Sequence, residues 1–242
     1  MLNLCGLYLG DDSEMLGSMP SNPKGHWENV PLMNINRELL LAFGGAWDFP
    51  PDMVFGWEKR KMVEGVRRKA LEYTKKFEGR EPWGWKDPRN SLTVPFWRSC
   101  FPDLKVLICV RNPLDVARSL RRRGGSSFVF GVEMWVKYHD RLFRDTESGM
   151  RLVTHFDSFF ADPGSELERI FSWLGVGLTA ERRDAAVDTI AKSLRHNQGG
   201  GHQVPLTAKQ AEIAVEMYNR LCDEAGPVFE KTGKRMKIGG SG

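Results

Sequence analysis

A basic residue and a helix start follow directly after an apolar segment in this sequence of 242 residues. The run Leu104–Val110 ends at Arg111, and Asn112 and Pro113 are typical of the first positions of a helix. The backbone N–H groups and the dipole of a helix start favour an anion. Arg111 therefore stands where an anionic ligand is expected.

Two further residues extend this pattern. Ser119 and Arg123 are four residues apart, so they lie on one face of the same helix. A guanidinium group and a hydroxyl that converge near a helix start bind phosphate. The alternative is a basic surface helix with a solvated Ser119, and this is also how we interpret Arg121 and Arg122.

A second group of charged residues surrounds Lys86. Taken alone, Lys86 would pair with Asp87 or Glu81. We interpret Asp87 and Arg89 as a local ion pair that orders a turn. The histidines His139 and His155 are more often ordinary polar residues than catalysts.

The elements that position these residues alternate between helix and strand. Strands are predicted at Pro82–Lys86, Leu104–Val110 and Met150–Phe156. Helices or helix-compatible segments are predicted at Met1–Leu9, Pro31–Phe43, Gly56–Phe77, Asn90–Cys100 (capped by Asn90 or Ser91), after Asn112, and at Phe128–Thr146, Ser165–Leu174, Thr179–Leu194 and Thr207–Phe229.

This alternation predicts an α/β fold in three layers, a parallel sheet flanked by helices. The continuous apolar run Leu104–Val110 suits a strand buried on both faces, with Cys109 as a small buried residue. Ligands of such sheets bind beyond the carboxyl ends of the strands. We expect a single domain over residues 1–238 and a flexible tail at 239–242.

Composition excludes several classes of protein. Hydrophobic residues make up 41% of the chain, which is too many for a disordered protein, and the net charge of +4 does not indicate a nucleic-acid partner. The four scattered cysteines suit neither a zinc site nor a disulfide scaffold, so we expect a cytoplasmic protein without a metal. No apolar run is long enough for an integral membrane segment.

Several segments resemble one family. The motif R-N-P-x-D-V-x-x-S at Arg111–Ser119 resembles the 3′-phosphate-binding motif of sulfotransferases that use 3′-phosphoadenylyl sulfate (PAPS). Trp85–Arg89 is similar to the K-D-P strand end of tyrosylprotein and bacterial carbohydrate sulfotransferases, and Asn22–Glu28 to the N-P-K-G-x-W-E loop of bacterial-type members. Leu152–Phe160 and Ser165–Gly175 resemble their later strand and helix.

The resemblance implies a P-loop-like sulfotransferase fold and a role for five residues. Arg111, Ser119 and Arg123 would hold the 3′-phosphate of the donor. Lys86 would reach the sulfuryl group and stabilise charge on the bridging oxygen. Glu28 would be the general base that takes a proton from the acceptor; the alternative is that Glu28 is a salt-bridge partner within its loop.

These residue types suit sulfuryl transfer, which resembles phosphoryl transfer. The protein mainly positions the reactants and stabilises charge in an in-line transition state. A lysine neutralises the leaving group and a carboxylate activates a hydroxyl, so PAPS is the implied co-substrate and no metal is required. The acceptor would be a glycan, a lipid or a small molecule.

The sequence departs from the family at its start. Members open with a strand and a loop resembling G-x-H-R-S-G-T-S, which wraps the 5′-phosphosulfate. That loop is expected just before Leu4–Gly10, but the sequence begins at Met1, and Gly199–Gly201 is no substitute. We therefore expect an N-terminally incomplete fold and poor activity. Arg195 and His196 are further candidates for donor binding.

Three functions remain in competition. The first is a sulfotransferase acting on a hydroxyl or an amine. The second is an impaired protein of the same fold that binds the nucleotide or a partner without turnover. The third, a nucleotide kinase, is disfavoured because no G-x-x-x-x-G-K-[ST] motif occurs in the sequence.

Overall fold

The computed structural model describes residues 1–18, 25–190 and 206–237. It is a mixed α/β protein, mostly helical, with a small parallel sheet. The chain forms two compact units: a C-terminal unit (Met1–Cys5 with Lys105–Gly242) and an N-terminal unit (Gly6–Leu104). Arg195, His196, Gly199–Gly201 and the predicted tail lie outside the described residues.

The C-terminal unit contains both described strands. Its elements are β1 (Val106–Val110), α4 (Pro113–Gly124), α5 (Phe128–Arg144), β2 (Arg151–His155), α6 (Ser158–Ala161), α7 (Pro163–Leu174), α8 (Ala180–Asp188), α9 (Ala208–Asp223) and α10 (Pro227–Thr232). The strands predicted in this unit are therefore confirmed, as are the helices predicted after Asn112 and at Phe128–Thr146 and Ser165–Leu174, with ends that differ by a few residues. The helix predicted at Thr179–Leu194 is α8, which ends earlier, at Asp188, and residues 191–194 lie outside the described residues.

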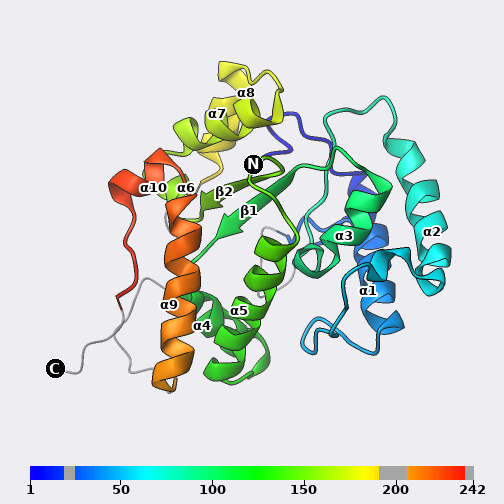
Figure 1. The fold of residues 1–242 in the computed structure, drawn as a ribbon. Helices are drawn as coiled ribbons and strands as arrows, with labels where there is room; N and C mark the ends of the chain where they lie inside the picture. The colour runs from blue at the N-terminus through cyan, green and yellow to red at the C-terminus, as the bar shows by residue number, and fades with distance from the viewer. Residues whose placement is uncertain (19–24, 191–205, 238–242) are drawn as a thin grey trace. The chain divides into compact units, whose positions relative to one another are not determined.

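The sheet is a parallel pair, in which β1 and β2 run side by side (Figure 1). Val106 is opposite Arg151 and Val110 is opposite His155, and the pairing continues through a 2.7 Å bond from the Phe156 N–H to the Val110 carbonyl. Both strands therefore end together, and Arg111 and Phe156 follow at the same edge.

Helices cover both faces of β2. On one face, Leu152 packs in the cluster formed with Leu167, Ile170 and Phe171 of α7. On the opposite face, the ring of His155 lies against α9 and α10. The order of layers predicted from the sequence is thus present around this strand, but the described sheet has two strands rather than a broad central layer.

The prediction that Cys109 is buried is wrong. Ile108 and Val110 are buried, whereas Cys109 between them is exposed. Side chains alternate along a strand, so Cys109 points to the face opposite Ile108 and Val110, and the described part of the chain leaves it exposed there. An apolar run in sequence reports its own hydrophobicity and not how many neighbours cover it.

Helices α4 and α5 cross at very short distance. Ala117 is fully buried, and a Cβ atom built on Gly131 would lie 2.7 Å from the Ala117 Cα. Only a glycine at this position of α5 lets the two helices approach so closely. This contact fixes α4, the helix that carries Ser119 and Arg123.

The predicted last helix is two helices. Thr207 caps α9 with a capping box to Gln210. The helix then ends at Asp223, because Gly226 has a left-handed φ of 85° and Pro227 has no N–H to donate. Pro227 instead begins α10.

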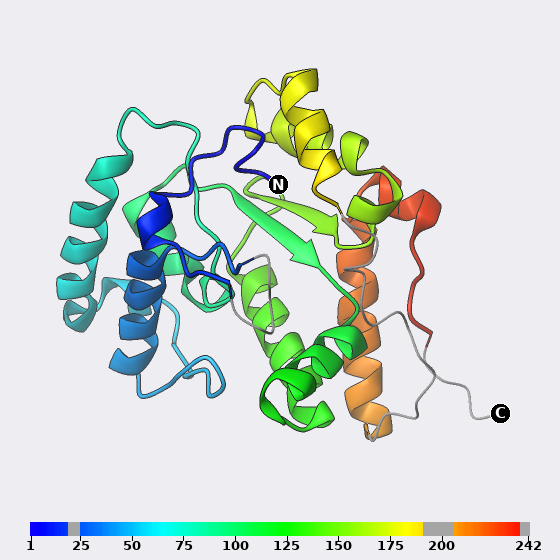
Figure 2. The same cartoon turned by 180° about the vertical axis from the view of Figure 1, so that it is seen from behind.

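The N-terminal unit is made of helices and turns (Figure 2). Its elements are the 3₁₀ turns η1 (Asp12–Glu14), η2 (Trp57–Lys59), η3 (Lys61–Val63) and η4 (Lys75–Phe77) and the helices α1 (Val30–Ala42), α2 (Glu64–Thr74) and α3 (Asn90–Cys100). Its core is aromatic and aliphatic, with fully buried Leu32, Leu39, Phe77, Leu92 and Trp97.

Three predictions for this unit need correction. Met1–Leu9 is not a helix, because Gly6 has a φ of 104° and the chain turns there. Pro82–Lys86 forms a single bridge, Tyr8 with Trp83, rather than a strand. Gly56–Phe77 is interrupted, because Gly56 is left-handed and Arg60 is extended, so that the α-helix begins only at Glu64.

No helix in the described ranges is both long enough and apolar enough to cross a membrane.

We expect Gly131→Ala to destabilise the protein. Overpacking against the Ala117 backbone costs about 1–3 kcal/mol, and the better helix propensity of alanine offsets up to about 1 kcal/mol of that. The matched control is Gly65→Ala in α2, where an added Cβ meets nothing within 4 Å and stability should rise. Urea unfolding measures both variants, and equal changes would contradict the packing argument.

Candidate active site

Glu28 occupies a fixed place at the start of α1. Its carbonyl accepts a 2.8 Å bond from the Leu16 N–H, and the next residue, Asn29, caps α1 by accepting from the Leu32 N–H. Trp27, just before it, has a left-handed φ of 53°, a strained conformation for a non-glycine residue. The backbone thus holds the Glu28 side chain at the start of the helix.

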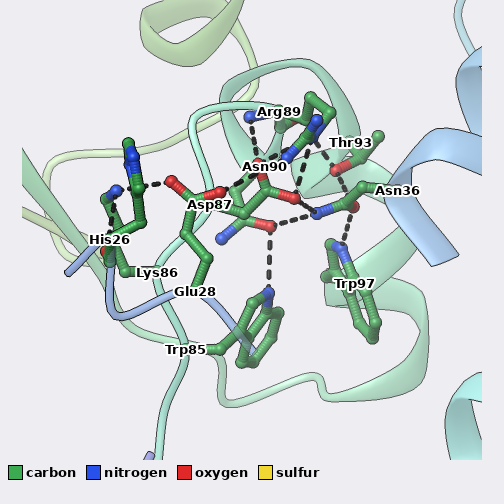
Figure 3. Close-up of polar contacts among 10 residues, drawn as sticks. All are labelled: His26, Glu28, Asn36, Trp85, Lys86, Asp87, Arg89, Asn90, Thr93 and Trp97. Carbon is green, nitrogen blue, oxygen red and sulfur yellow. Dashed lines mark hydrogen bonds and ion pairs between the residues drawn. The ribbon is translucent and has the colours of Figure 1, made fainter. Parts of the chain in front are cut away.

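The structure brings Lys86 and Glu28 into direct contact (Figure 3). The Lys86 Nζ lies 2.6 Å from the Glu28 Oε1 and also donates to the His26 carbonyl at 3.2 Å. Lys86 therefore pairs with Glu28, not with Asp87 or Glu81. The two predicted catalytic residues are 58 positions apart in sequence and adjacent in space.

Asp87 and Arg89 form the predicted local ion pair. The Asp87 Oδ1 accepts from the Arg89 backbone N–H at 3.0 Å and from the Arg89 Nε at 2.8 Å. Burial raises the pKa of the Asp87 carboxyl, and the charge of Arg89 opposes that rise. Arg89 also extends to Glu28, with 3.5 Å between its Nη2 and the Glu28 Oε2.

A fully buried asparagine supports this turn from α1. The Asn36 amide nitrogen donates to Asp87 at 2.8 Å and to Asn90 at 2.7 Å. Its oxygen accepts from the Thr93 hydroxyl at 2.7 Å and from the Trp97 indole at 2.8 Å. Both N–H donors and both lone pairs of this amide are thus used, which fixes Asp87 against α3.

Sequence reasoning missed Asn36 and the role of Asn90. Asn90 or Ser91 was predicted as the helix cap, yet Arg89 stands at the cap position, and the Asn90 side chain accepts from Asn36 and Trp85. A signal for Asn36 was available: it lies among Leu32, Ile35 and Leu39 on the apolar face of α1. A polar residue on a buried face requires a partner.

The predicted phosphate-binding helix begins as expected. Asn112 caps α4 by accepting a 2.9 Å bond from the Leu114 N–H. Farther along, the Arg123 Nη2 lies 3.2 Å from the Ser119 Oγ, so these two predicted residues are neighbours on one face. The helix carries four arginines, at 118 and 121–123, against a single Asp115.

Arg111 occupies the end of β1 in a partly buried setting. Its guanidinium lies 4.2 Å from the centre of the Phe156 ring. Burial lowers the pKa of Arg111, while the carboxylates of Asp115 and Asp157 oppose that shift. An arginine remains charged in spite of such a shift, so the site holds a cation between two acids.

Helix α5 fixes the backbone of Arg111. The Trp135 indole donates to the Arg111 carbonyl at 3.1 Å. The next turn of α5 brings His139 against Trp135, with its Nδ1 2.7 Å from the Trp135 carbonyl and ring centres 4.1 Å apart. A carbonyl only accepts hydrogen bonds, so the Nδ1 of His139 carries a proton. Burial lowers the pKa of His139 to about 4.

His155, at the end of β2, is a buried structural residue. Its Nδ1 accepts from the Asp157 N–H at 3.1 Å, so its proton is on Nε2, which donates to the Tyr218 hydroxyl at 3.0 Å. Burial raises the pKa of Tyr218. This arrangement ties β2 to α9.

A sequence model of the sulfotransferase family matches residues 55–180, just over half of the chain. The chain belongs to the sulfotransferase family. No curated protein and no solved structure matches it. The family match contains Lys86, Arg111, Ser119 and Arg123, whereas Glu28 lies outside it.

We expect Asn36→Ala to be strongly destabilising in this sulfotransferase-family chain. The change removes the four hydrogen bonds that Asn36 makes with Asp87, Asn90, Thr93 and Trp97 and leaves the buried Trp97 N–H without this acceptor, at a total cost of at least about 3 kcal/mol. The matched control is Asn34→Ala, an exposed position of the same helix, where stability should change by less than about 0.5 kcal/mol. Equal urea midpoints for Asn36→Ala and Asn34→Ala would show that the hydrogen bonds of Asn36 do not stabilise the fold.

His139 should make stability depend on pH. Its pKa is lowered in the folded chain, so the unfolded chain takes up a proton first as the pH falls from about 6.5 to about 4. The stability that the neutral His139 contributes is fully present above about pH 6.5. It is lost as the pH falls toward about 4, by up to about 1.4 kcal/mol per pH unit. Unfolding of wild type and His139→Gln at several pH values tests this, and parallel curves would contradict it.

Proposed function

We propose that this chain is a sulfotransferase that moves a sulfuryl group from PAPS to a hydroxyl or an amine of a glycan, lipid or small-molecule acceptor. One observation carries the proposal: the Lys86 ammonium and the Glu28 carboxylate, from separate motifs, meet at 2.6 Å. Family membership supplies the reaction class. The proposal includes the P-loop-like fold of the family, a reducing cytoplasmic location and a reaction without a metal.

The residues of α4 suit the 3′-phosphate of the donor. A hydroxyl on Ser119 and a guanidinium on Arg123 lie together, and Arg111 adds a second guanidinium where β1 leads into the capped helix start. Guanidinium groups bind phosphate through paired N–H donors. The bound nucleotide would present its sulfuryl group for transfer.

Lys86 and Glu28 suit the chemistry of transfer. An ammonium group stabilises the negative charge that develops on the bridging oxygen. A carboxylate removes the proton of an attacking hydroxyl. In the structure these groups neutralise each other, so the ion pair must open before either group acts.

The second candidate is a protein that binds the nucleotide without turnover. The same ion pair favours it, because a Lys86 that stays with Glu28 is not available to the leaving group. The two functions share the 3′-phosphate site. They differ in whether sulfate appears on an acceptor.

Calorimetric titration with adenosine 3′,5′-bisphosphate tests the shared site. Arg111→Ala should weaken binding by at least about 10-fold, because a charge-assisted hydrogen bond contributes roughly 1.5–3 kcal/mol. Ser119→Ala should weaken binding by less, about 3- to 10-fold, since its hydroxyl is neutral. Absence of binding by wild type would defeat the assignment.

The matched control is Arg121→Ala, an exposed arginine of the same helix. Its affinity should stay within about twofold of wild type, because it removes only long-range charge. If Arg121→Ala weakens binding as much as Arg111→Ala, the helix attracts anions as a general basic surface. Transfer of radioactive sulfate to a panel of acceptors then separates the enzyme from the binding protein.

A further inference from the structure

Glu28 is held between two cations that differ in their freedom to move. Its side chain is 8% exposed and contacts Lys86 through one oxygen and Arg89 through the other. The side chain of Lys86 is 56% exposed, and that of Arg89 is 17% exposed. The carboxylate therefore has one partner on its solvent side and one partner within the protein.

Arg89 is fixed by groups other than Glu28. Its Nε donates to both oxygens of Asp87, at 2.8 and 3.1 Å, and its backbone N–H donates to the same carboxylate. Asp87 is in turn held by Asn36 from α1 (Figure 3). Moving Arg89 away would leave the Asp87 side chain, which is 1% exposed, without its cation.

Lys86 carries no comparable restraint in its described contacts. Its ammonium donates to Glu28 and to the His26 carbonyl, both in the same loop. A flexible lysine stem lets the ammonium turn toward another anion. If it does so, the buried charge of Glu28 needs a remaining partner, because an unpaired buried carboxylate is strongly unfavourable.

We propose that Arg89 is a positioning residue that retains the Glu28 carboxylate while Lys86 leaves it to engage the donor. This inference rests on the proposed function, and it assigns to Arg89 more than the ordering of a turn. Lys86 is the exchangeable partner and Arg89 the permanent one. Glu28 thereby keeps its place and its compensating charge throughout transfer.

The test is a double-mutant cycle of Glu28→Gln with Arg89→Gln, read as the equilibrium constant of unfolding in urea. The combined effect should depart from the product of the single effects by at least about fivefold. The departure should increase in a Lys86→Met background, where Arg89 alone faces Glu28. Additivity within about twofold would overturn the proposal and leave Arg89 as a partner of Asp87 only.

Two controls sharpen the cycle. The pair Glu28→Gln with Arg37→Gln, an exposed arginine of α1, should be additive. If Arg89→Gln does not fold, Arg89→Lys replaces it, because lysine keeps the charge and cannot span Asp87 and Glu28 together. A departure of at least about threefold is then expected, and additivity again overturns the proposal.

Kinetics separate this inference from the proposed function. Arg89→Lys should lower kcat by at least about 10-fold, while affinity for adenosine 3′,5′-bisphosphate and the acceptor KM stay within about twofold. Equal loss of nucleotide affinity would indicate a merely structural role and count against the proposal. If wild type transfers no sulfate, the proposed function fails, and the unfolding cycle alone decides the role of Arg89.

Discussion

The carboxylate of Asp87 is almost completely withdrawn from water, and such burial is unfavourable unless strong partners surround the charge. Arg89 supplies the cation and Asn36 an amide donor from another helix. The raised pKa of Asp87 shows that burial outweighs these partners. Satisfying this one group therefore constrains the turn after Lys86, and with it the side on which Lys86 and Arg89 approach Glu28.

A related arrangement holds Arg111 in the C-terminal unit. There the buried charge is the cation, and Asp115 and Asp157 are the acids that favour its charged form. Its carbonyl is held by Trp135, and the α4 helix that follows is held by the close approach of Gly131 to Ala117. In both units a functional candidate stands shortly before a helix, and a side chain of another helix holds that segment: Asn36 of α1 holds Asp87 next to Lys86, and Trp135 of α5 holds the Arg111 carbonyl.

The sequence predicted local features well and long-range contacts poorly. Asn112, with a proline after it, is a local signal, and α4 begins where expected. The contact of Lys86 with Glu28 depends on segments 58 residues apart, so no local pattern contains it. The prediction that Cys109 is buried was wrong for the same reason. Its burial depends on the segments that pack around β1, and the hydrophobicity of the strand does not report them.

The ion pair between Lys86 and Glu28 is weakened by the exposure of the Lys86 side chain to solvent. Water already solvates much of the Lys86 ammonium and screens the pair, so the ammonium itself loses little when it turns away. Two charge-assisted bonds to an incoming anion contribute more, about 1.5–3 kcal/mol each. The pair that neutralises both groups at rest is thus weak enough to open for a donor. Because Arg89 stays with Glu28, opening it does not expose the buried carboxylate without a partner.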